Sequence, residues 1–135
     1  MNKVKITIVA GICIIAAVGA FFAIRYAVKL QDYKKRINSI AISNVDLKKV
    51  PNGTYKGSYD AVMVAADVSV TVTNHKIDTI RITKHVNERG KKAEAIVDDV
   101  ISKQSLKVDT VSGATNSSKV ILKAIENALK SGEIK

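Results

Sequence analysis

Residues Ile6 to Ile24 form a run of 19 amino acids without a charged side chain. As a helix this run would be about 28 Å long, close to the roughly 30 Å hydrocarbon core of a bilayer. The sequence therefore predicts one transmembrane helix within an N-terminal membrane anchor of residues 1–30. Lys3 and Lys5 precede the run, which also fits a cleaved signal peptide, and this alternative stays open.

Positive charge is concentrated beside this run. The chain has 22 Lys and Arg against 12 Asp and Glu, a net charge of +10, and residues 1–36 account for +6 of it. Basic side chains at such a place meet anionic lipid head groups. The rest of the chain has no basic helix interleaved with aromatic residues, so no nucleic-acid partner is predicted. Taken alone, the basic residues after the run favour a cytoplasmic location for the C-terminal domain.

The chain beyond the anchor has room for one small domain. Residues 31–50 are predicted to be a juxtamembrane linker, and the turn signal Pro51-Asn52-Gly53 marks the domain boundary. Residues 51–135 then form the domain, because about 85 residues suffice for one core but hardly for two. The single cysteine, Cys13, permits no internal disulfide.

Alternation of apolar and polar residues predicts an antiparallel hairpin. Valines alternate with polar residues from Asp67 to Thr73, Asn74-His75 fits a tight turn, and a second strand carries isoleucines at 77, 80 and 82. A further strand is predicted earlier, from Thr54 to Ser58. These strands would form a small sheet with one buried face.

Two later segments have helical periodicity. After a break at Glu88-Arg89-Gly90, a helix of about three turns is expected between Ala93 and Gln104. A second helix, beginning just after Thr115, has an apolar stripe and an opposite face that carries Lys119, Lys123, Glu126 and Lys130. The predicted fold class is α+β, a small antiparallel sheet with two packed helices, preceded by a single N-terminal transmembrane helix.

The segment that is most informative about function lies just before this last helix. It reads Asp109-Thr110-Val111-Ser112-Gly113-Ala114-Thr115. Gly113 permits a sharp turn and a close approach of a ligand to the backbone. A helix N-terminus offers unpaired N–H groups, so an anion held by Ser112, Thr115, Ser117 or the nearby amides would be stabilised, which suits a phosphate. The alternative interpretation is a helix cap, in which Thr115 or Ser117 satisfies the free amides.

The pattern D-x-x-S/T-G-A-T/S is met here by Asp109, Ser112, Gly113, Ala114 and Thr115. It resembles the flavinylation motif of FMN-binding domains. Such domains occur in the C subunit of the sodium-translocating NADH:quinone oxidoreductase, in the G subunit of the Rnf complex and in small membrane-anchored flavoproteins. The resemblance covers about residues 52–129. It departs from the family after the first strand, where many relatives have a Gly-rich stretch and residues 60–64 read DAVMV.

The resemblance implies specific roles for these residues. A flavin transferase, using FAD and a magnesium ion, would join FMN through its phosphate to the hydroxyl of Thr115. Recognition and shaping of the acceptor loop for the transferase would fall to Asp109, Ser112, Gly113 and Ala114. These four and Ser117, which lies at the helix N-terminus, are the further candidate cofactor-binding residues. No catalytic residue and no metal ligand of the chain itself is predicted.

The resemblance also implies a function. The protein would be an electron-transfer flavoprotein, held by a single span in the cell membrane with its domain on the extracytoplasmic side. It would pass electrons from a membrane-side donor to an extracytoplasmic acceptor, as a redox carrier rather than a stand-alone enzyme. The alternative is a membrane-anchored binding or assembly module with the same fold and no flavin.

Other residues have less support in the sequence as flavin contacts, metal ligands or catalytic groups. Tyr55 and Tyr59 have the flat apolar rings that a flavin needs as neighbours, although strand tyrosines more often belong to the core or its rim. His75 and His85 have no partner at metal-ligand spacing and are expected to be solvated or structural. The serines and threonines of the motif lack a G-x-S-x-G elbow and an identifiable base, so a hydrolase is not predicted.

Overall fold

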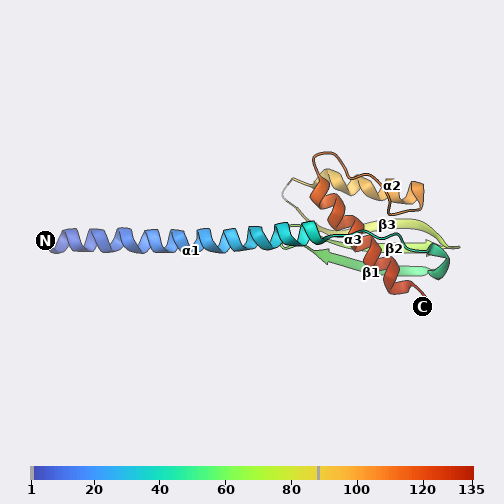
Figure 1. Cartoon of the computed structure of the whole chain (residues 1–135), viewed down its shortest axis with the longest axis horizontal. Coiled ribbons are helices and arrows are strands. Elements are labelled where there is room, and N and C mark those ends of the chain that lie inside the picture. The colour runs from blue at the N-terminus through green and yellow to red at the C-terminus, as the bar shows by residue number, and fades with distance from the viewer. Residues whose placement is uncertain (1, 88) are drawn as a thin grey trace.

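A long N-terminal helix and a small α+β body make up the structure, a computed structural model that describes residues 2–87 and 89–135 (Figure 1). In chain order its elements are α1 (Lys3–Ser39), η1 (Leu47–Lys49), β1 (Gly53–Asp60), β2 (Ala65–Thr73), β3 (Lys76–Val86), η2 (Lys91–Ala95), α2 (Ile96–Lys103) and α3 (Thr115–Gly132). This arrangement confirms the predicted α+β class with one long apolar helix at the N-terminus.

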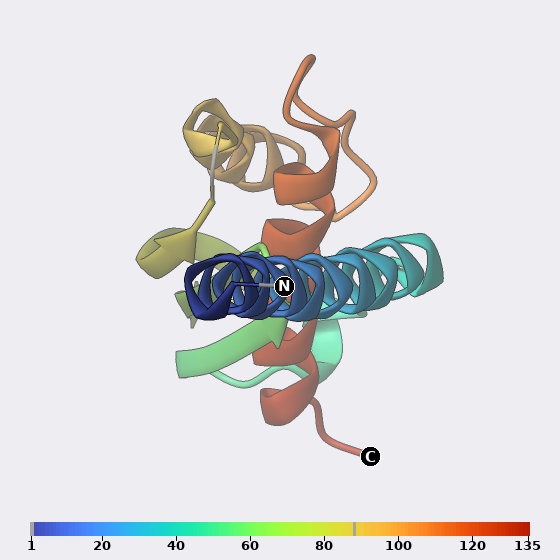
Figure 2. The ribbon, with the colours of Figure 1, turned by 90° about the vertical axis from the view of Figure 1, so that its left-hand side faces the viewer.

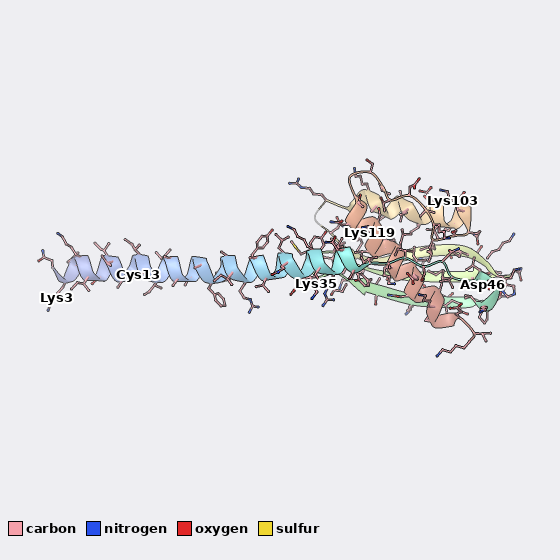
Figure 3. The ribbon with its side chains drawn as sticks, viewed as in Figure 1. Lys3, Cys13, Lys35, Asp46, Lys103 and Lys119 are labelled. Atoms are coloured by element: carbon pink, nitrogen blue, oxygen red, sulfur yellow. The ribbon has the colours of Figure 1, made fainter. Side chains whose placement is uncertain are left out.

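The helix α1 projects away from the body, and its side chains point outward without protein around them over most of its length (Figure 3). Ile15 and Phe22, for example, are 74% and 66% exposed. In the described part of the chain, α1 is the one helix long and apolar enough to cross a membrane, and a signal sequence would meet the same criteria. The helix continues beyond the apolar run to Ser39, so its last turns reach the body.

The three strands form an antiparallel meander in the order β1-β2-β3. The predicted hairpin is confirmed, since β2 and β3 join at Asn74-His75, whose φ values of 51° and 59° suit a tight two-residue turn. Two register shifts in the pairing of β2 with β3 each place an extra residue in β3. For this reason Ile77 and Ile80 both pack on the core although they are three positions apart.

One face of the sheet forms the core. The helix α3 packs across β1 and β2 and runs behind α1 in the end-on view of Figure 2. At the closest approach of β1, a Cβ atom on Gly57 would overlap the α3 backbone at Ala124 and Ala128. The helix that begins at the motif is therefore seated directly on the buried side chains of β2, which are Ala66, Val68, Val70 and Val72.

The helix predicted between Ala93 and Gln104 is divided into η2 and α2. Its first turn is tighter because the Ala93 amide bonds to the Gly90 carbonyl, three residues back, at 2.9 Å. The helix α2 ends at Lys103, and the side chain of the next residue, Gln104, accepts a hydrogen bond from the amide of Ile77 on β3 and donates one to its carbonyl. Glu88, in the predicted break before this region, lies outside the described residues.

The predicted polar face of α3 is not open to solvent at Glu126, which is fully buried. Ser43, in the segment after α1, donates to the Glu126 carboxylate through its hydroxyl at 2.7 Å and its amide at 3.3 Å. Lys123 and Lys130 donate to the same carboxylate. Burial raises the pKa of Glu126, but the hydrogen bonds from Lys130, Ser43 and Lys123 outweigh it and lower the pKa to about 2.

Candidate functional site

The motif forms a tight turn that leads into α3. The Ala114 amide donates to the Val111 carbonyl at 2.9 Å, and Gly113 has a φ of +74°, which is unfavourable for other residue types. A Cβ atom on Gly113 would also lie only 2.6 Å from Nζ of Lys92. Glycine is thus favoured at this position by its conformation, whereas the flexible Lys92 side chain could move away from a larger residue.

A serine that the motif does not include holds this turn in place. The hydroxyl of the buried Ser118 accepts a hydrogen bond from the Val111 amide at 3.0 Å and donates to the Ala114 carbonyl at 2.8 Å. Within the described residues no side chain caps the start of α3, whose N-cap residue is Ala114. The interpretation of Thr115 or Ser117 as a helix cap is therefore wrong, and the first amides of α3 stay available to a ligand.

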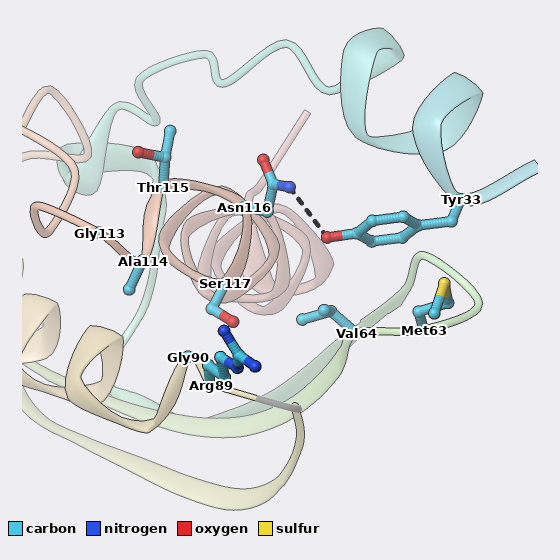
Figure 4. A pocket seen from close by; sticks show the side chains of 10 residues that line it. All are labelled: Tyr33, Met63, Val64, Arg89, Gly90, Gly113, Ala114, Thr115, Asn116 and Ser117. Carbon is cyan, nitrogen blue, oxygen red and sulfur yellow. Dashed lines mark hydrogen bonds between the residues drawn. The ribbon is translucent and has the colours of Figure 1, made fainter. Parts of the chain in front are cut away.

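A cavity of about 370 Å³ opens beside this turn (Figure 4). Four of the six predicted site residues line it, namely Gly113, Ala114, Thr115 and Ser117. Asp109 and Ser112 are exposed and are not among the residues that line the cavity. Asn116, in the same turn of α3, also lines the cavity, and three other parts of the chain complete it with Tyr33, Met63, Val64, Arg89 and Gly90.

The two hydroxyls at the start of α3 face different surroundings. Thr115 is exposed and its side chain points away from Arg89 and Gly90, whereas the Ser117 hydroxyl points towards them (Figure 4). Ser117 is only 4% exposed, and a Cβ atom on Gly90 would overlap its hydroxyl oxygen. Of these two residues, Thr115 is the one that another protein can reach.

Two cations lie beside the turn. Arg89 lines the cavity, and the Lys92 ammonium group lies over Gly113. Both side chains belong to exposed residues between β3 and α2, some 20 positions before the motif. Their charges favour an anion at the start of α3, where the helix dipole acts in the same direction.

The histidines and strand tyrosines lie away from the cavity. Nδ1 of His85 is 3.0 Å from Oε1 of Glu94, and its Nε2 is buried without a hydrogen-bond partner among the described residues. Tyr55 donates its hydroxyl to the Pro51 carbonyl at 2.7 Å, and neither Tyr55 nor Tyr59 is among the lining residues. His85 therefore has a structural role between β3 and η2, and the tyrosines belong to the edge of the core.

Comparison with protein families identifies this part of the chain. Residues 64–130, from the end of the β1–β2 turn to the last turns of α3, match the family model of the FMN-binding domain. The matched part of the chain is an FMN-binding domain. Its cofactor is FMN. Comparisons with curated proteins and with solved structures give no match.

The residues around the cavity of this FMN-binding domain fit the two ends of the cofactor. An anion at the uncapped start of α3 would have Lys92 and the Thr115 hydroxyl on one side and Arg89, next to Ser117, on the other. At the opposite end of the cavity lie Tyr33, Met63 and Val64, which offer an aromatic and apolar surface (Figure 4). The volume also falls within the roughly 300–1,000 Å³ of small-molecule sites.

Sequence reasoning missed several of these residues. Asn116 and Ser118 adjoin the motif and could have been found by asking which side chains hold the turn. Tyr33, Arg89 and Lys92 carry no local signal, because only the packing of α1 and η2 against the start of α3 brings them to the site.

Proposed function

We propose that this protein is a membrane-anchored electron-transfer flavoprotein whose FMN is joined to Thr115 by a phosphoester bond. The observation that carries the proposal is the position of Thr115 in an FMN-binding domain: it is exposed, starts an uncapped helix and borders the cavity. The ammonium group of Lys92, which lies over the nearby Gly113, suits the phosphate that this bond would place there.

Attachment is a phosphoryl transfer from FAD, carried out by a flavin transferase that uses magnesium. The Thr115 oxygen bonds to the phosphorus of the FMN half, the bond between the two phosphates of FAD breaks, and AMP leaves. The threonine proton passes to the transferase, since the domain has no base among the residues around the Thr115 hydroxyl in the described structure. In this step Gly113 and Ala114 shape the acceptor turn, and the outward position of Thr115 gives the transferase access.

The anchor and the location of the site suggest how the protein works. The helix α1 spans the membrane, and Tyr33 at the cavity follows the last residue of the apolar run, Ile24, by nine positions or about 14 Å along the helix. The flavin is therefore held close to the bilayer surface, and the resemblance to membrane-anchored flavoproteins, which usually carry their flavin outside, favours the extracytoplasmic side. There the protein would carry electrons from a membrane-side donor to an extracytoplasmic acceptor, and the bound FMN would supply the redox chemistry.

The proposal predicts a flavin that survives denaturation. Full-length protein co-produced with a flavin transferase should remain yellow after unfolding in detergent, and its intact mass should exceed that of the unmodified chain by one FMN minus water. Protein made without the transferase is the control and should lose its colour. A colourless, unmodified protein in both preparations would favour the second candidate function, an anchored binding or assembly module with the same fold.

Substitution of Lys92 tests the position of the phosphate through a smaller expected effect. We expect Lys92→Gln to slow flavinylation by about fivefold, because an exposed ion pair contributes up to about 1 kcal/mol. Lys91→Gln is the matched control, since Lys91 is its exposed neighbour on η2 but does not approach Gly113. The measurement is the initial rate of FMN incorporation by purified transferase and FAD. Equal rates for the two variants would remove Lys92 from the acceptor site.

A further inference from the structure

The cavity has one wall that does not belong to the FMN-binding domain. Tyr33 lies on α1, outside the matched residues 64–130, and yet it lines the cavity. Its hydroxyl oxygen accepts a hydrogen bond of 2.9 Å from Nδ2 of Asn116, drawn as a dashed line in Figure 4. Because Asn116 directly follows Thr115, this bond fixes the phenol ring within the same turn of α3 as the predicted acceptor.

The surroundings of the phenol ring are apolar. Met63 and Val64, from the turn between β1 and β2, lie on its side of the cavity, while Gly113 lies at the other end and Arg89 lies between them, next to Ser117. The cavity thus has a charged end near the acceptor turn and an apolar end against α1. An FMN held by its phosphate at the charged end would extend its flat ring towards Tyr33.

The chain offers few other rings for this role. It contains four tyrosines, two phenylalanines and no tryptophan. Among the residues that line the cavity, Tyr33 is the one with an aromatic side chain. Tyr26 faces a different groove, along α1 and Val62, and the two phenylalanines lie in the apolar run.

We propose that the phenol ring of Tyr33 is the aromatic neighbour of the isoalloxazine ring of FMN, so that the anchor helix forms one wall of the flavin site. This proposal rests on the attachment of FMN at Thr115. It means that α1 does more than hold the domain at the membrane. The flavin environment depends on how the end of α1 is seated against the start of α3.

The test uses the fluorescence of the attached flavin in full-length protein, purified in detergent after co-production with a flavin transferase. A phenol in contact with an excited flavin quenches its emission by donating an electron that then returns, whereas a phenylalanine ring is too hard to oxidise. We expect Tyr33→Phe to lengthen the fluorescence lifetime of the attached flavin several-fold. Two matched controls, Tyr26→Phe on the same helix and Tyr59→Phe on β1, should leave the lifetime unchanged.

The intact mass of the same samples distinguishes a failure of the FMN attachment at Thr115 from a failure of the Tyr33 contact. Full FMN occupancy with an unchanged lifetime in Tyr33→Phe would overturn the role of Tyr33 and leave the attachment standing. Absence of FMN from the wild-type protein would overturn the attachment and this proposal with it. In denaturant, the flavin of the wild type and of the three variants should have one common fluorescence lifetime. This would show that the longer lifetime of Tyr33→Phe arises from the folded site.

Discussion

Replacement of Thr115 by alanine is expected to abolish covalent attachment of FMN. Alanine lacks the hydroxyl that forms the phosphoester, and the other nearby hydroxyls are poorly placed: Ser112 lies outside the cavity lining, and Ser117 is buried against Gly90. Full-length Thr115→Ala protein, co-produced with a flavin transferase, should show the unmodified mass and no fluorescent band after denaturing electrophoresis. The expected loss is complete, because no bond can form.

Two further variants test whether the loss of FMN is specific to the Thr115 hydroxyl. Thr115→Ser should keep the attachment, since it retains a hydroxyl at the first position of α3. Ser117→Ala should also carry FMN, because its hydroxyl points towards Arg89 and Gly90 rather than outward. Alanine is a good helix former, so Thr115→Ala should fold like the wild type. FMN found in Thr115→Ala, and mapped to Ser112 or Ser117, would contradict the assignment of the acceptor.

Local patterns in the sequence were sufficient for most of the fold. The alternation in β2, the turn at Asn74-His75 and the apolar stripe of α3 each arise from the residues involved, and the structure has all three. The register shifts of β3 and the division between η2 and α2 depend on contacts with other elements, and the sequence did not predict them. The burial of Glu126 was missed for the same reason, because a residue 83 positions away, Ser43, covers it.

The candidate site also has a part that the local sequence predicts and a part that depends on contacts between distant segments. The motif around Gly113 and Thr115 is contiguous, so its turn and the start of α3 could be predicted. The walls of the cavity come from α1, the β1–β2 turn and the segment before η2, and no periodicity relates Tyr33 or Arg89 to Thr115. The acceptor could be predicted from the sequence, whereas the space that receives the rest of the cofactor required the structure.

The segment after α1 links the anchor to this space. Ile37, near the end of α1, and Val45 and Val50, after it, are buried in the core, so residues 37–50 pack as part of the body. Glu126 holds the middle of this segment through Ser43, and Lys123 adds a hydrogen bond of 3.0 Å to the Ala41 carbonyl. Since Tyr33 precedes the segment by a few residues, the position of α1 over the cavity depends on this attachment.

Glu126→Gln is therefore expected to lower the free energy of unfolding by about 3 kcal/mol at neutral pH, which corresponds to the difference between a pKa of about 2 in the folded protein and 4.5 for the unperturbed group. The amide keeps the size of the side chain but removes the charge that Lys123 and Lys130 contact. Urea unfolding of the full-length protein in detergent, followed by tyrosine fluorescence, measures the change. Asp99→Asn, at an exposed carboxylate of α2, should change stability by less than about 0.5 kcal/mol.

The pH dependence provides an independent test of the cause. Because the folded state lowers the pKa of Glu126, its contribution is fully present above about pH 4.5 and is lost as the pH falls to about 2, where the carboxylate takes up a proton. The stability difference between wild type and Glu126→Gln should accordingly narrow over this interval and stay constant from about pH 5 to 8. A difference that persists unchanged at about pH 2 would show that the amide disturbs packing, and that the ion pairs with Lys123 and Lys130 do not hold the segment to α3.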